Sequence, residues 1–278
     1  MEKINIIKEN KRLEVYIKLN KLLIEREDFS ISNLNEIKKI KLNLLDSIYF
    51  NLLNLQKILE GIKINDSIHN YVDPNVVANN CRALIERIAL YNYLFNHDNQ
   101  ELTKFLISLY KYESLKRIEL DEGKITERNE LEEYKQKELE VLKKYCMNND
   151  THYEKVKAII DKYNFNGFIE IKDKKIEKLS YTKIIENCTS NKYFKNLYHF
   201  LSNKTHPSFV SITTLKSSIN KSDYLEKSYQ YVSETLFYVN YVFSLFKEEF
   251  NFEKEMHSQL SNEEKDLIYD DLKFFMKN

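Results

Sequence analysis

Titratable and hydroxyl side chains are concentrated in the segment Tyr198-His-Phe-Leu-Ser-Asn-Lys-Thr-His-Pro-Ser208, around the step from His206 to Pro207. This step ends one apolar-periodic segment and begins another, so backbone amides without helical partners are expected beside these side chains. A histidine near the C-terminus of a helix gains proton affinity from the helix dipole and titrates near neutral pH. His206 is therefore a candidate general acid and base, which Tyr198 and Ser202 on the same helical stripe would position. Alternatively, His206 and Ser202 satisfy each other's hydrogen bonds and only mark a helix end.

A second candidate is the pair Arg82 and Glu86, whose spacing of four residues places both side chains on one helix face. Small residues above and below the pair would let another helix approach closely and bury it. One interpretation is a structural ion pair between two helices, since removing one partner of a buried pair costs about 3–5 kcal/mol. The other is an arginine that binds phosphate or an anionic transition state, held in place by Glu86. Lys204 and Ser208 are further candidates for binding the anion.

The remaining patterns indicate neither a metal nor a cofactor. The other histidines are scattered, without an H-x-x-x-H or H-E-x-x-H pairing, so no metal is expected. Three isolated glycines cannot form a glycine-rich phosphate loop, so no cofactor is expected either.

Composition narrows the class of protein. Lys+Arg 43 balances Asp+Glu 43, so there is no overall basic field for nonspecific nucleic-acid binding, although a local basic face remains compatible with neutrality. The three cysteines have no paired spacing, which is typical of a reducing cytoplasm. No apolar run approaches the roughly 20 residues that span a bilayer. We therefore expect a cytoplasmic protein without a membrane partner.

Gly 3 and Pro 2 in 278 residues favour long helices over folds with many tight turns. The only strand-like alternation predicts at most one short β-hairpin near 165–178. Helix N-caps are expected at Asp73, Asp98, Ser180 and Ser261, and Gly61 is expected to help end a helix. Apolar periodicity predicts helices over 3–27, 33–62, 74–97, 99–121, 125–147, 151–164, 181–188, 191–205, 222–250 and 262–276.

These elements predict an all-α fold, an antiparallel helical bundle with a projecting charged helical hairpin, in a single domain over 1–278. The core bundle would comprise about 33–121 plus 151–250. The hairpin arm would span about 105–147, and its charge-rich part would be a solvated spacer. The helix over 262–276 would close the chain.

Taken together, the two motifs resemble those of a bacterial family of helical proteins known as a domain of unknown function. In that family an R-x-L-x-E helix precedes a Y-x-x-L-S-x-x-x-H-x-S segment, and the resemblance covers roughly 40–245. More distantly, the chain resembles the HEPN superfamily, antiparallel four-helix bundles of toxin–antitoxin, abortive-infection and CRISPR systems, many of them metal-independent ribonucleases. The matching residues are Arg82, Leu84, Glu86, Tyr198, Leu201, Ser202, His206 and Ser208.

The resemblance implies a defence or toxin-type protein that cleaves RNA without a metal. His206 would transfer protons, Arg82 would clamp the phosphate and Glu86 would orient Arg82. HEPN nucleases carry both catalytic groups on one segment, as R-x(4–6)-H, whereas no arginine stands at that distance before His206. Catalysis would therefore need Arg82 from another helix to meet His206. A homodimer is also implied, because composite sites in HEPN-like proteins often form across a twofold axis.

Two functions without catalysis are the alternatives. In the first, the same residues form a buried network in a helical interaction or sensor subunit, antitoxin-like, that binds a cognate protein of a phage-defence or stress system. In the second, Arg82 and the helix start at Pro207 form the anion site of a nucleotide- or anion-binding effector. The sequence leaves open which of the three functions applies, and hence whether the protein is an enzyme.

Overall fold

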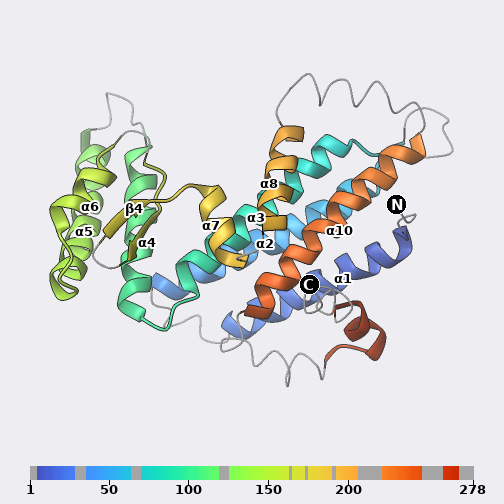
Figure 1. The fold of residues 1–278 in the computed structure, drawn as a ribbon, viewed down its shortest axis with the longest axis horizontal. Helices are drawn as coiled ribbons and strands as arrows, with labels where there is room; N and C mark the ends of the chain where they lie inside the picture. The colour runs from blue at the N-terminus through green and yellow to red at the C-terminus, as the bar shows by residue number, and fades with distance from the viewer. Residues whose placement is uncertain are drawn as a thin grey trace. The chain divides into compact units, whose positions relative to one another are not determined.

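Most of the chain is helical in the computed structural model (Figure 1), which confirms the predicted all-α class. The structure describes residues 5–28, 36–63, 70–118, 125–162, 165–172, 175–189, 192–205, 221–245 and 259–268. Contacts between residues divide the chain into two compact units, 1–92 with 185–278 (unit 1) and 93–184 (unit 2). The single domain over 1–278 stays a prediction, because this grouping does not test independent folding.

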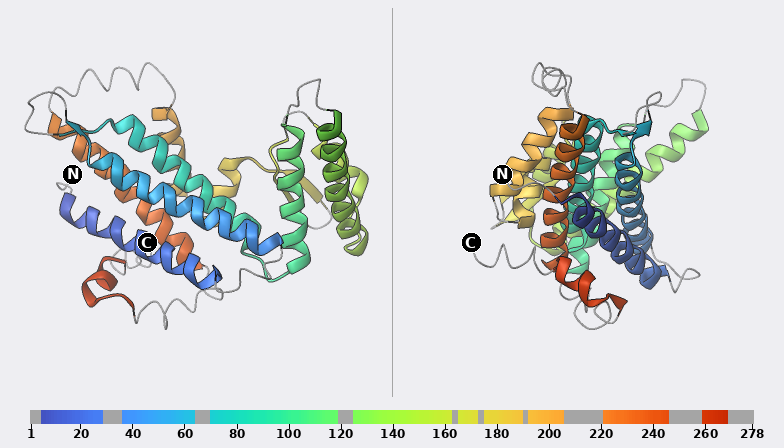
Figure 2. Two further views of the ribbon diagram at one scale, coloured as in Figure 1. Left: turned by 180° about the vertical axis from the view of Figure 1, so that it is seen from behind. Right: turned by 90° about the vertical axis from the view of Figure 1, so that its right-hand side faces the viewer.

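Unit 1 is built from long helices. α1 (Ile6–Asp28), α2 (Glu36–Leu59) and α10 (Lys221–Leu245) pack side by side (Figure 2). α3 (Pro74–Phe95) begins in this unit, α7 (Tyr181–Thr189) ends in it, and α8 (Lys192–Thr205) lies wholly within it. The predicted 3.6-residue stripe of α2 forms part of the core, where its leucines and isoleucine are at most 1% exposed: Leu45, Ile48, Leu52 and Leu55.

Side-chain caps fix several of the helix starts. The caps predicted at Asp73, Ser180 and Ser261 are confirmed, since each side-chain oxygen accepts a backbone N–H of the following turn. The cap predicted at Asp98 is wrong. Asn99 takes this role, and its Oδ1 accepts from the amides two and three residues along at 2.9 and 3.3 Å.

Unit 2 contains a helical hairpin of α4 (Gln100–Lys116) and α5 (Ile125–Asn148), next to α6 (Tyr153–Ile160). The ring of Phe105 on α4 stacks on Tyr145 of α5, with centroids 4.3 Å apart. Over 129–148, the part of α5 whose side chains the structure describes, Leu142 and Cys146 are the fully buried apolar residues. Most of this part faces solvent, as its charge-rich sequence predicts.

The short hairpin expected near 165–178 is present. β3 (Ile169–Lys172) pairs antiparallel with β4 (Lys175–Lys178). The hydroxyl of Tyr93 holds β3 against the end of α3, because it donates to the Ile169 carbonyl at 2.8 Å and accepts the Ile169 N–H at 3.0 Å. A second antiparallel pair, the two-residue strands β1 (Ile62–Lys63) and β2 (Asn70–Tyr71), was not predicted.

Candidate functional site

Three of the predicted site residues meet between α3 and α8. Oε1 of Glu86 accepts a hydrogen bond from Nε of Arg82 at 3.0 Å and another from the hydroxyl of Tyr198 at 2.8 Å. The guanidinium carbon of Arg82 lies 5.6 Å from the centroid of the Tyr198 ring. One carboxylate oxygen therefore fixes a cation from its own helix and a phenol from another.

Local packing explains why these side chains meet. On α8, Phe194, Leu197 and Leu201 are buried at helical spacing, and Tyr198 belongs to the same buried face. The rings of Phe194 and Tyr238 of α10 make a T-shaped contact, with centroids 5.3 Å apart. These contacts fix α8 in unit 1 and hold the Tyr198 hydroxyl against α3.

The charged pair is less buried than its small neighbours predict. The side chains of Arg82 and Glu86 keep 26% and 27% of their surface exposed. A fully buried pair would act only on the fold, whereas this pair is open enough to contact a ligand from solvent. Because the Tyr198–Glu86 hydrogen bond also joins two helices, the pair has a structural contribution as well.

The electrostatics of the cluster keep Tyr198 and Arg82 in fixed protonation states at neutral pH. Burial raises the pKa of Tyr198, and the negative charge of Glu86 and the hydrogen bond to it raise that pKa further. Partial burial lowers the pKa of Arg82, but Glu86 and Tyr198 outweigh it, and the net pKa is raised. Tyr198 therefore remains a hydrogen-bond donor and Arg82 a cation.

The other predicted site residues are only partly described. Ser202 lies one helical turn after Tyr198, and Lys204 follows in the last turn of α8. His206 and Ser208 lie outside the described residues. A positioning effect of Tyr198 and Ser202 on His206 thus stays a prediction, and the partner that the structure gives to the Tyr198 hydroxyl is Glu86.

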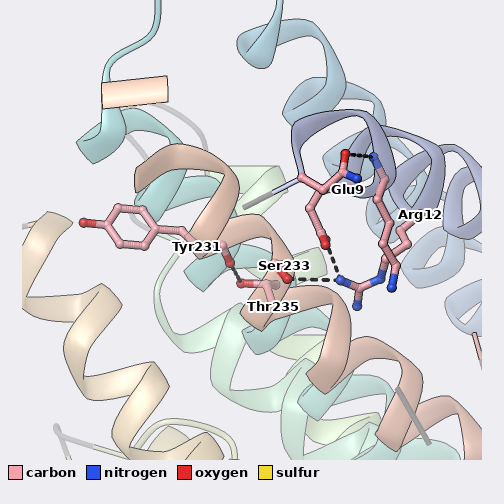
Figure 3. Close-up of polar contacts among 7 residues, drawn as sticks. Glu9, Arg12, Tyr231, Ser233 and Thr235 are labelled. Atoms are coloured by element: carbon pink, nitrogen blue, oxygen red, sulfur yellow. Dashed lines mark hydrogen bonds and ion pairs between the residues drawn. The ribbon is translucent and has the colours of Figure 1, made fainter. Parts of the chain in front are cut away.

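Sequence reasoning missed a buried charged cluster between α1 and α10 (Figure 3). Arg12 is only 2% exposed and pairs with Glu9 at 2.5 Å on its own helix. It also donates to Oγ of Ser233 at 3.0 Å. Its guanidinium carbon lies 4.7 Å from the centroid of the Phe237 ring. The i,i+3 spacing of Glu9 and Arg12 was a signal, but many charged residues on α1 share such spacings.

This cluster is structural. Its cation is enclosed by protein groups from two helices, which satisfies the charge without a ligand. The thiols of Cys81 and Cys188 are also unreactive. Burial raises the pKa of Cys81 and of Cys188 to about 12, so both thiols stay protonated at neutral pH.

Comparison with known proteins finds no family model, no curated protein and no solved structure that matches this chain. The family resemblance therefore stays an expectation drawn from the two motifs. In the described ranges, no cluster of at least three histidine, cysteine or acidic residues has metal-binding geometry. Nor does any helix in these ranges have the length and apolar character needed to cross a membrane.

Proposed function

We propose that the protein is a metal-independent ribonuclease of a bacterial defence or toxin system, with Arg82 as phosphate clamp and His206 as general acid and base. The observation that supports this most is the double hydrogen bond accepted by Glu86. A guanidinium is planar, and a partner fixed at Nε together with a ring beside it restricts the orientation of that plane. Recognition of a phosphate by two parallel N–H groups depends on such an orientation.

The proposed reaction uses only side chains of this protein. His206 takes the proton of the ribose 2′-hydroxyl, and the oxygen attacks the adjacent phosphorus. Arg82 neutralises the charge that develops on the phosphorane. The bond to the 5′-oxygen then breaks, and His206 returns the proton to the leaving oxygen. The products are a 2′,3′-cyclic phosphate and a 5′-hydroxyl.

An RNA cleavage assay in EDTA tests the proposal. We expect His206→Ala to lose activity about 100-fold or more, the usual contribution of general acid–base catalysis. Arg82→Lys keeps the charge but loses the planar fork, and we expect a comparable loss. The matched controls are His199→Ala on the exposed side of α8 and Arg87→Lys on α3. Nε of Arg87 donates to Oγ of Ser47 at 2.6 Å. Cleavage that is equal in all four variants would exclude the proposed site.

An interaction or sensor subunit is the second candidate, favoured by the hydrogen bond that ties Tyr198 of α8 to Glu86 of α3. If this bond serves only the fold, Tyr198→Phe and Arg82→Ala should lower the melting temperature while no RNA cleavage is found in any variant. The proposed homodimer is checked separately by light scattering. A monomeric protein that still cleaves RNA would remove the dimer but not the site.

A further inference from the structure

The solvent-facing side of α8 carries two large aromatic rings. Tyr193 and Phe200 are 46% and 43% exposed. Their positions differ by seven, so they lie on one stripe of the helix, about 10 Å apart along its axis. The Phe200 ring packs against Tyr231 of α10 in a T-shaped arrangement, with ring centroids 5.6 Å apart. An exposed ring anchored in this way, as Phe200 is, can accept a further ring.

Positive charge accompanies these rings. α8 contains three lysines and no acidic residue, although the whole chain is neutral. The ammonium group of Lys204 lies 5.5 Å from the centroid of the Phe200 ring. Burial lowers the pKa of Lys204, and so does the neighbouring charge of Lys227 on α10. An anion close to both lysines would relieve this repulsion.

Acidic groups of the neighbouring helices also interact with α8. Glu186 of α7 forms an ion pair with Lys195 of α8. The third lysine of α8 is Lys192. Burial, and then the nearby Glu234 of α10, raise the pKa of Tyr193. Burial also raises the pKa of the Glu234 carboxyl. With three lysines and no acidic residue, α8 itself contributes positive charge to its outer side.

We propose that Tyr193, Phe200, Lys204 and Lys227, the α8 outer face, bind single-stranded RNA. Bases would stack on the two rings, and the lysines would contact the phosphates between and beside them. A span of about 10 Å corresponds to about three nucleotide steps at 3.4 Å each. The bases of a duplex are already stacked on one another and cannot stack on Tyr193 or Phe200, so this surface would select single strands.

This inference rests on the proposed function for the identity of the polymer as RNA. It deepens that function, because α8 also carries Tyr198, which contacts Glu86 beside Arg82. The α8 outer face lies on the side of the helix away from Tyr198, so it would hold the strand beyond the cleaved bond.

The test is a binding measurement on the His206→Ala protein, so that cleavage does not interfere. Fluorescence anisotropy of a labelled oligouridylate of about 12 nucleotides gives the Kd. We expect Phe200→Leu and Tyr193→Leu each to raise the Kd about fivefold or more, the lower bound for one stacked base. Phe50→Leu on α2, where the ring is 58% exposed, is the matched control and should leave the Kd unchanged. Melting temperatures identify a variant that fails to fold, in which case the other ring decides.

Two further arms define the ligand. Lys204→Gln should reduce the slope of log K against log salt by about 0.7, the value for one phosphate contact on a single strand. A DNA strand of the same length should bind similarly, since stacking needs no 2′-hydroxyl, whereas an RNA duplex should bind more weakly. Equal affinity for the duplex, or ring variants that bind like the Phe50→Leu control, would overturn the inference. Ring-dependent binding without any cleavage by the wild-type protein would instead overturn only the proposed function.

Discussion

Removal of the buried cation Arg12 has the largest predicted effect on stability. In Arg12→Met an unbranched apolar side chain replaces the aliphatic stem of the arginine. The Glu9 side chain, 10% exposed, then lacks its cation, and Oγ of Ser233 loses this donor. Breaking a buried pair on one side costs about 3–5 kcal/mol. For a unit of this size each kcal/mol lowers the melting temperature by about 2–4 °C, so we expect a decrease of about 6–20 °C.

Urea unfolding followed by circular dichroism measures this cost by linear extrapolation. The matched control is Lys11→Met, the adjacent position on α1, whose ion pair with Glu263 is 2.6 Å long but largely exposed. Exposed ion pairs contribute little to stability, so the control should unfold nearly like the wild type. The double variant Glu9→Gln with Arg12→Met removes both charges, and we expect it to recover most of the lost stability.

Two results would refute this reasoning. If Arg12→Met costs no more than Lys11→Met, the cation is not buried as described. If the double variant is less stable than Arg12→Met alone, the loss comes from packing around the side chain rather than from the unpaired carboxylate.

Two further predictions concern single groups. Tyr93→Phe removes both hydrogen bonds to the Ile169 backbone, and we expect the free energy of unfolding to fall by about 2 kcal/mol and the Ile169 amide to exchange its hydrogen faster. Tyr134→Phe on the exposed side of α5 is the control and should change neither quantity. Unchanged exchange at Ile169 would contradict the assigned bonds. Burial raises the pKa of Glu234 above its ordinary value of 4.5, so the stability linked to this carboxyl is present below pH 4.5 and is lost as the pH rises through the raised pKa. Glu234→Gln should therefore raise the urea midpoint at pH 7 and leave it unchanged at pH 3.5, whereas equal shifts at both pH values would exclude titration of Glu234 as the cause.

The sequence predicts those parts of the fold that depend on near neighbours. The start of α3 at Pro74 follows from the adjacent Asp73 cap, and the β3–β4 hairpin follows from local alternation. The error at the start of α4 is of the same local kind. Asp98 and Asn99 are both good caps, and only the backbone conformation of Asn99, with φ −99° and ψ 105°, distinguishes them.

Contacts between distant segments were harder to predict. The spacing of four residues brings Arg82 and Glu86 together, but their third partner, Tyr198, lies 112 positions from Glu86. The Arg12 cluster depends on Ser233, which is 221 positions away. Periodicity shows that a helix has an apolar face, but it does not show which helix covers that face or which charged residue is enclosed between them.

A double-mutant cycle on the rate of RNA cleavage in EDTA tests most directly whether Arg82 and His206 act on one phosphate. Groups that act as a unit give losses that are far from additive. We predict that the protein with both Arg82→Lys and His206→Ala cleaves no more slowly than the slower single variant. Losses that multiply fully would mean that the two residues act independently, and a wild-type protein without cleavage would contradict the proposed ribonuclease altogether.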